Sequence, residues 1–119
     1  MEKLIVAIKK SWIVESSLLP KEWFEINPAR GQCAVTALIV QDYLGGDILK
    51  SDVLGNNDSH FYNKLKSEEI LDLTSSQFAA DVIFETEKLA DRNKILSWPG
   101  TRKRYELLRK RVWSVILKQ

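Results

Sequence analysis

The strongest hydrophobic pattern in the chain begins at its single cysteine. From Cys33 to Leu44 the sequence is almost all apolar, which is typical of a helix that is buried on every side. Pro28 and Gly31 mark an irregular segment before this run, and Gly45-Gly46 follows it, as glycines commonly follow a helix C-terminus. The pattern therefore predicts a buried central helix that carries Cys33 in its first turn.

Amphipathic patterns predict one further helix near each end of the chain. Over residues 2–14, one face carries the apolar residues Leu4, Ile5, Ile8 and Trp12. Over residues 101–117, with Thr101 as N-cap, one face carries Tyr105, Leu108, Val112 and Val115. Residues 21–26 predict one more helical turn, which would bury Trp23 and Phe24.

The middle of the chain has the pattern of strands and turns. Residues 48–54 predict one strand, and the sequence Gly-Asn-Asn-Asp at 55–58 predicts a turn. Residues 59–65 alternate aromatic and polar side chains, as a strand with one wet face would. With a turn at 66–69 and a strand at 70–74, we expect an antiparallel hairpin, although its turn lacks glycine.

The segment after the hairpin has a weaker pattern. Thr74 and Gln77 have the spacing of a capping box, so a short helical turn is expected there. Residues 79–95 are expected to form a loop with at most one short helix. Together these patterns predict a single α+β domain over residues 1–119, in which the Cys33 helix packs on a small antiparallel sheet between flanking helices.

Composition narrows the classes of protein that fit. The 119 residues are 45% hydrophobic and 29% charged, which is ordinary for a globular domain. One cysteine cannot form an internal disulfide, so we expect a reducing, cytoplasmic setting. The apolar run at residues 4–8 is too short to span a membrane, and no membrane partner is expected. With one histidine and one cysteine, neither a zinc site nor a cofactor is expected.

The net charge of +2 hides an asymmetry along the chain. Residues 101–119 contain seven basic residues and only Glu106 as an acid, a net +6, so the remaining residues carry −4. A basic helix of this kind can dock on nucleic acid, on a membrane surface or on the acidic remainder of its own domain. Because no aromatic and basic residues interleave here, we favour a solvated helix surface over nucleic-acid binding.

Three residues of the predicted elements carry candidate chemistry. At a helix N-terminus, free N–H groups and the helix dipole favour the thiolate of Cys33 over the thiol, although a lone cysteine is often a small core residue. His60, the sole histidine, and Asp72 are predicted on the two hairpin strands. If the hairpin turns near Lys66 or Ser67 they are opposite or diagonal neighbours, and with an odd-length loop they share one face of the sheet. If the Cys33 helix packs against that face, the three form a Cys–His–Asp triad. Considered alone, each residue has a simpler interpretation: His60 would be a polar strand residue that faces water, and Asp72 would be a residue at the end of a strand that hydrogen-bonds to a turn.

The sequence around these residues resembles known families. Gly31-Gln32-Cys33 resembles the transglutaminase nucleophile motif, and helix cysteine, strand histidine and strand aspartate follow one another in the papain-like and transglutaminase-like superfamily. A closer resemblance, to bacterial YunG-type proteins, covers nearly the whole chain. Its segments are NPARGQCAVTAL (27–38), VQDYLGG (40–46), SHFYN (59–63), DLT (72–74) and RYELL (104–108).

The superfamily resemblance implies roles for particular residues. Cys33 would attack the carbonyl carbon of an amide or thioester, His60 would take the thiol proton and pass it to the leaving group, and Asp72 would orient His60. The Cys33 backbone N–H would stabilise the oxyanion. A second oxyanion donor would come from Gln32, Trp12 or Trp23, with no choice among them. Arg30 would hold a substrate carboxylate or form a salt bridge that fixes its loop.

The resemblance and the residues together predict a cysteine-dependent hydrolase or acyltransferase whose amide-like substrate stays open, as does the oligomeric state. The alternative is a non-catalytic binding or regulatory domain that keeps the fold. Such a domain would bind nucleic acid or a partner through its basic C-terminal helix.

Overall fold

The computed structural model describes residues 1–55 and 58–119, which form four α-helices and one four-stranded antiparallel sheet. The helices are α1 (Glu2–Ser11), α2 (Cys33–Leu44), α3 (Arg92–Ser97) and α4 (Thr101–Leu117). The strands are β1 (Asp47–Val53), β2 (Ser59–Lys64), β3 (Ile70–Leu71) and β4 (Phe84–Leu89). Single turns of 3₁₀ helix lie at Val14–Ser16, Pro20–Glu22 and Ser75–Gln77. The predicted α+β class is therefore confirmed.

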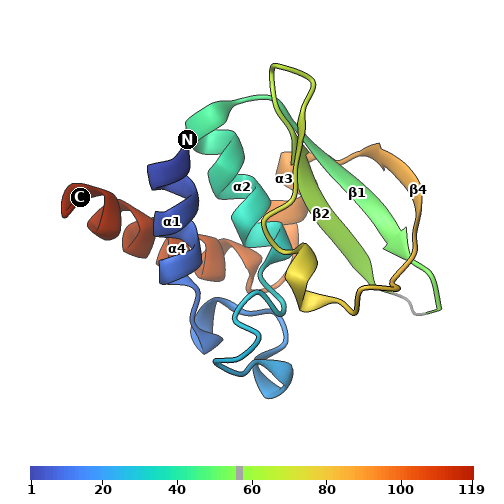
Figure 1. Ribbon diagram of the computed structural model, residues 1–119, viewed down its shortest axis with the longest axis horizontal. Coiled ribbons are helices and arrows are strands. Elements are labelled where there is room, and N and C mark those ends of the chain that lie inside the picture. The colour runs from blue at the N-terminus through green and yellow to red at the C-terminus, as the bar shows by residue number, and fades with distance from the viewer. Residues whose placement is uncertain (56–57) are drawn as a thin grey trace.

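Helix α2 lies between the other long helices and the sheet. Figure 1 shows α1, α2 and α4 grouped on one side of the molecule and the strands on the other. Helix α1 packs on α4, whereas α2 packs on both α4 and β2. Leu38, Ile39 and Val40 of α2 are 0% exposed. The prediction of a buried central helix from Cys33 to Leu44 is thus confirmed.

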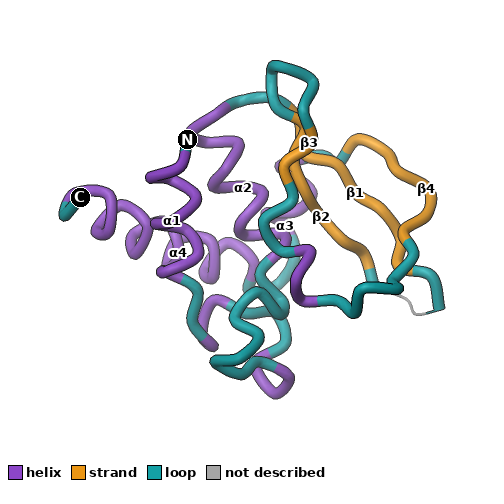
Figure 2. Tube along the Cα trace, in the orientation of Figure 1, coloured by secondary structure: helices purple, strands orange, loops and turns teal. Residues whose placement is uncertain are grey.

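The sheet has the strand order β3-β2-β1-β4 (Figure 2). Strands β2 and β3 form the expected antiparallel hairpin, with Asn63 opposite Leu71 and Lys64 opposite Ile70. On the other side of β2, Ser51 of β1 lies opposite His60. Because β3 has only two residues, it pairs with one end of β2 and leaves the edge of β2 at His60 without a strand neighbour among the described residues.

Both faces of β2 are covered, so the prediction of one wet face is wrong. His60, Phe61, Tyr62 and Asn63 are all buried. Asn63 faces α2, where its Nδ2 donates a hydrogen bond to the carbonyl oxygen of Ala37 at 3.0 Å. Because side chains alternate along a strand, Phe61 shares this face and His60 and Tyr62 lie on the other. The expectation that α2 packs on the face of His60 is therefore also wrong.

Strand β4 lies in the segment that was expected to be mostly loop, so that prediction is wrong as well. All six residues of Phe84–Leu89 are exposed, and three of them are charged. An edge strand that carries charges is protected against pairing with other chains, but it lacks the alternation by which a strand is found in sequence. The short helix expected in this segment is present as α3.

Smaller differences lie in the N-terminal part and in the turns. Helix α1 ends at Ser11 rather than at Val14. The turn expected to bury Phe24 is shorter, and Phe24 is 62% exposed. The turn at Ser75–Gln77 is present, but Thr74 makes no side-chain capping hydrogen bond. The predicted turn at 55–58 includes Asn56 and Asn57, which lie outside the described residues. Within the described part of the chain, no helix is both long and apolar enough to cross a membrane.

Candidate functional site

Cys33 is the first residue of α2, and the segment before it is fixed by hydrogen bonds to its neighbours. Ser17 Oγ donates to the carbonyl oxygen of Arg30 at 2.7 Å, and the Leu18 N–H donates to that of Gly31 at 2.9 Å. Gly31 has a φ of +75°, and a Cβ there would lie 2.3 Å from Ser17 Oγ. Only glycine fits at this close approach, which directs the chain into α2 at Cys33.

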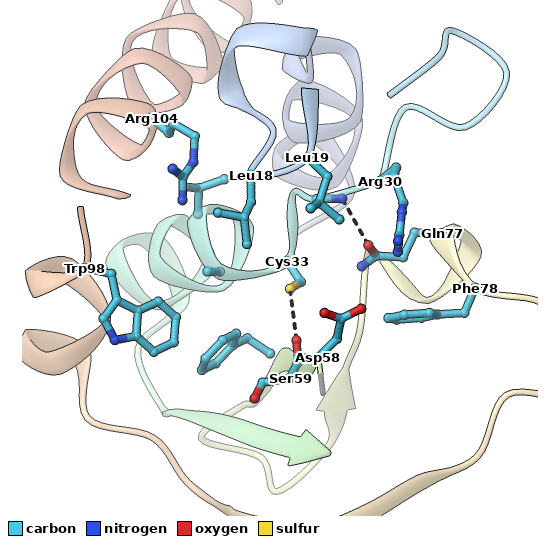
Figure 3. A pocket seen from close by; sticks show the side chains of 14 residues that line it. Leu18, Leu19, Arg30, Cys33, Asp58, Ser59, Gln77, Phe78, Trp98 and Arg104 are labelled. Atoms are coloured by element: carbon cyan, nitrogen blue, oxygen red, sulfur yellow. Dashed lines mark hydrogen bonds between the residues drawn. The ribbon is translucent and has the colours of Figure 1, made fainter. Parts of the chain in front are cut away.

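The Cys33 side chain is half-buried and lines a cavity of about 230 Å³. Its sulfur lies 4.0 Å from the carbonyl oxygen of Ser59, on the open edge of β2 (Figure 3). As one of the first N–H groups of a helix, the Cys33 N–H has no partner within α2. Cys33 therefore combines an accessible sulfur with a backbone donor beside it.

His60 and Asp72 form the contact that the hairpin predicts. His60 Nε2 and Asp72 Oδ2 are 2.7 Å apart, and the imidazole is 0% exposed. The register that pairs Lys64 with Ile70 places Tyr62 opposite Asp72, so His60 and Asp72 are diagonal neighbours. The other carboxylate oxygen of Asp72, Oδ1, accepts a hydrogen bond from the Thr74 N–H at 3.2 Å. Asp72 thus both binds the turn and holds the imidazole.

Cys33 reaches His60 around the open edge of β2 rather than across a face of the sheet. With Nε2 bonded to Asp72, only Nδ1 of His60 is left to face the cysteine. Nδ1 is buried and makes no hydrogen bond of standard geometry with any described residue. Cys33 is nevertheless close enough to raise the His60 pKa. Such loose contacts are common in unliganded catalytic sites.

The charge state of His60 follows from competing influences. Burial lowers the pKa of the imidazole, but the hydrogen bond with Asp72 and the contact with Cys33 raise it, and the resulting pKa is about 9. The imidazole is therefore a cation at neutral pH, with a carboxylate on one side and a sulfur on the other. This is the charge distribution that a thiolate–imidazolium pair requires.

Three aromatic rings enclose the imidazole. Tyr62 and Phe84 stack on it with centroids 5.5 Å and 4.9 Å away, and Phe78 meets it edge-on at 5.0 Å. These rings exclude water, and the stacked faces of Tyr62 and Phe84 attract the cation. Phe78 and Phe84 come from the segment whose pattern was least informative, so no spacing in the sequence pointed to this enclosure.

Three of the residues proposed as oxyanion donors have other partners. Gln32 is 0% exposed, and its amide accepts from Ser16 Oγ at 2.8 Å and donates to the Ile13 carbonyl at 2.9 Å. Trp12 Nε1 donates to Thr36 Oγ1, and Trp23 Nε1 donates to the Pro28 carbonyl, both at 2.9 Å. None of the three is among the described residues that line the cavity.

Arg30 does line the cavity, but its guanidinium forms an ion pair with Glu22 at 2.7 Å. The salt bridge that was the alternative for Arg30 is therefore present. This pair leaves Arg30 less available to a substrate than an unpaired arginine would be.

Gln77 is the polar residue of the cavity that the sequence interpretation missed. It is 9% exposed, and its Oε1 accepts a hydrogen bond from the Gly31 N–H at 3.0 Å. This bond fixes the orientation of the amide and leaves Nε2 buried, with no hydrogen-bond partner among the described residues. Figure 3 shows Gln77 at the same end of the cavity as Arg30 and Asp58. In the sequence, Gln77 stood out only for its capping-box spacing.

The two ends of the cavity differ in charge. Figure 3 shows Trp98 and Arg104 at one end, Arg30, Asp58 and Gln77 at the other, and Cys33 between them. No group of three or more His, Cys, Asp or Glu side chains within residues 1–55 and 58–119 is placed to hold a metal ion.

Comparisons with known proteins identify relatives of the chain. The family model described as YunG protein matches residues 1–116. A protein of Bacillus subtilis (strain 168), described as uncharacterized protein YunG, is 40% identical over 85 residues, which cover 71% of this chain and 69% of that protein. No solved structure matches the chain. Neither description states an activity.

Proposed function

The chain belongs to the YunG family, and we propose that it is a cysteine-dependent hydrolase or acyltransferase that acts on an amide or thioester. One arrangement carries this proposal: the buried His60 imidazole is hydrogen-bonded to the Asp72 carboxylate, and the Cys33 sulfur, close enough to raise the His60 pKa, opens into a cavity. Cys33 is the nucleophile, His60 the general acid and base, and Asp72 the residue that orients His60.

In the first step, the Cys33 thiolate attacks the carbonyl carbon of the substrate. The carbon–sulfur bond forms, and the carbonyl electron pair moves onto oxygen. Two donors are available for this oxyanion: the Cys33 N–H at the start of α2 and the Nε2 of Gln77. The unpartnered Nε2 supports this role because a buried donor without a partner is costly unless a ligand uses it. Gln77 thus takes the place for which Gln32, Trp12 and Trp23 were considered.

In the second step, the carbonyl re-forms and the bond to the leaving amine or thiol breaks. The leaving group takes the proton from His60 Nδ1, so that a thioester and a neutral imidazole remain. Water, or an acceptor amine, then gives a proton to Nδ1 and attacks the thioester. Release of the Cys33 thiolate restores the starting charges, with His60 again protonated.

We further propose that α2 and the sheet form a papain-like or transglutaminase-like core. The support is the chain order: a helix that begins at the cysteine, a strand that carries the histidine, and an aspartate at the end of the next strand. A nucleophilic thiol that must stay reduced also supports a cytoplasmic setting.

The test uses two reagents that need the same sulfur for different chemistry. Iodoacetamide alkylates a thiolate without forming an oxyanion, whereas p-nitrophenyl butanoate acylates it through one. In the wild type, we expect mass spectrometry to find both adducts on Cys33 at pH 6.5, where an ordinary thiol is only about 1% ionised. His60→Ala should slow both reactions at least tenfold.

Gln77→Glu separates the oxyanion role from the rest of the site. The variant keeps the oxygen that accepts from the Gly31 N–H but loses the Nε2 donor. We expect the ratio of acylation rate to alkylation rate to fall by roughly 10²-fold, as on removal of an oxyanion donor. If Cys33 reacts like an ordinary thiol with or without His60, the enzyme proposal is wrong. An unchanged ratio in Gln77→Glu contradicts the role of Gln77 alone.

A further inference from the structure

The cavity beside Cys33 has an arginine at one end that lacks an acidic partner. Arg104 lies in the first turn of α4, and its Nη2 donates to Thr101 Oγ1 at 3.1 Å. Its Nε is buried and has no hydrogen-bond partner in the described part of the chain. No carboxylate of the described residues lies within ion-pair distance of it.

The lack of an acidic partner is unusual for a guanidinium that is half-buried at the edge of a cavity. Burial lowers the pKa of Arg104 and outweighs the nearby charge of Cys33, which raises it. Arg30, which lines the same cavity, has Glu22 to offset its charge. The negative charge of Cys33 offsets only part of the cost of burying Arg104, and an anion that enters the cavity would offset more of it.

Most of the side chains that line the cavity with Arg104 and Cys33 are apolar. They include Leu18, Ala34, Phe61 and Trp98. Figure 3 shows the Arg104 guanidinium directed toward the space between Leu18 and Trp98. The volume of about 230 Å³ corresponds to roughly eight water molecules at about 30 Å³ each. A short hydrocarbon chain fits this shape and lining.

We propose that the acyl group taken by Cys33 is a short apolar chain that ends in a carboxylate, and that Arg104 binds this carboxylate. This inference rests on the proposed function, because it places the reacting carbonyl at Cys33. A guanidinium binds a carboxylate through two parallel hydrogen bonds, and its positive charge balances the negative charge of the carboxylate. The opposite end of the cavity does not suit an anion, since Asp58 lies there and Arg30 is already paired.

The experiment compares reagents that differ only in this terminal charge. Iodoacetamides whose nitrogen carries a chain of three to six carbons are prepared with a terminal carboxylate or with its methyl ester. In the wild type, at one or more chain lengths, Cys33 should react about tenfold faster with the carboxylate, the factor expected from one charge-assisted hydrogen bond. Arg104→Gln should abolish this preference. Arg102→Gln, which removes an exposed charge from the same helical turn, should keep it.

A second measurement does not depend on a reactive sulfur. Cys33→Ser protein is titrated with hexanoate and with hexanamide, and binding is followed through the NMR signals of Arg104 Nε and the Trp98 indole. Hexanoate should bind at least tenfold more tightly than hexanamide, and Arg104→Gln should remove the difference.

The outcomes separate this inference from the proposed function. Equal binding of hexanoate and hexanamide, or a preference that survives Arg104→Gln, overturns the carboxylate site. If His60→Ala leaves the alkylation rates unchanged while hexanoate binding still requires Arg104, the catalytic proposal fails. The anion site is then supported as the binding site of a non-catalytic domain.

Discussion

The charge of His60 is the property by which the proposed site can be tested most directly. His60 is the chain's single histidine, so in an untagged protein its imidazole nitrogens give the only signals of their kind. The perturbation is Asp72→Asn. Asparagine keeps an oxygen to accept from the Thr74 N–H, but its NH₂ group then faces His60 Nε2 and favours the neutral imidazole.

The size of the effect follows from the environment of His60. With a pKa of about 9, the wild-type imidazole is charged in a ratio of roughly 30 to 1 at pH 7.5. The hydrogen bond with Asp72 is the largest influence that favours this charge, while burial opposes it. A hydrogen bond to a charged group contributes about 1.5–3 kcal/mol. Its loss should lower the titration midpoint by about one to two pH units.

The measurement is a titration of the imidazole nitrogens between pH 5 and 10 by long-range ¹H–¹⁵N correlation. In the wild type at pH 7.5, both nitrogens should have the shifts of a protonated ring. In Asp72→Asn, a neutral ring with its proton on Nδ1 should appear within the titrated range. Asp81→Asn, which makes the same change at an exposed site, should leave the midpoint unchanged.

Two results would refute this reasoning. A wild-type midpoint below the ordinary histidine value of about 6.5 would mean that burial outweighs Asp72 and Cys33, and no imidazolium would then be present to support a thiolate. An unchanged midpoint in Asp72→Asn would mean that the carboxylate does not stabilise the charge. The Cys–His–Asp arrangement would then be a packing feature.

Three further predictions concern stability. Because the His60 pKa rises from 6.5 to about 9 on folding, the charged imidazole stabilises the fold fully below pH 6.5, and this stabilisation is lost as the pH rises through 9. Urea unfolding should therefore show the free energy of unfolding fall by up to about 3 kcal/mol over this range, and His60→Gln should lack this fall. Gly31→Ala should lower the free energy of unfolding by about 1–3 kcal/mol and slow Cys33 alkylation, because its Cβ would lie 2.3 Å from Ser17 Oγ. The control is Gly55→Ala, whose Cβ meets no described atom within 4 Å and which should affect only stability. Glu68→Gly should raise the unfolding free energy by about 0.5–1 kcal/mol in the same assay, because Glu68 has a φ of +75°.

The sequence predicts those parts of the fold whose pattern is set by burial or by chain breakers. Helix α2 is bounded by Gln32 and Gly45 as its apolar run and glycines indicate. The hairpin of residues 59–74 is predicted with its register left open, and the register observed makes His60 and Asp72 diagonal neighbours. These features depend on local spacing, which one sequence contains in full.

The parts that the sequence does not predict depend on contacts between distant segments. Phe84 belongs to a charged edge strand and yet covers the imidazole, so its role follows from the pairing of β4 with β1, the neighbour of β2. The indole N–H of Trp12 donates a hydrogen bond to Thr36 of α2, and only the folded chain shows this contact. Gln77 becomes a candidate oxyanion donor because Gly31 occupies its oxygen and leaves its nitrogen without a partner. No periodicity encodes such pairings.

The early end of β3 is what allows the sulfur and the imidazole to meet. If β3 continued to Thr74, as the pattern predicts, the register would place Thr74 opposite His60, and its backbone would cover the edge of β2 that Cys33 approaches. Asp72 prevents this, because its Oδ1 accepts from the Thr74 N–H and turns the chain away. The same carboxylate holds His60 through Oδ2. One side chain therefore both turns the chain away from this edge and raises the pKa of the imidazole, which is why the test at Asp72 is made with asparagine, the residue that keeps the turn but removes the charge and the acceptor for His60.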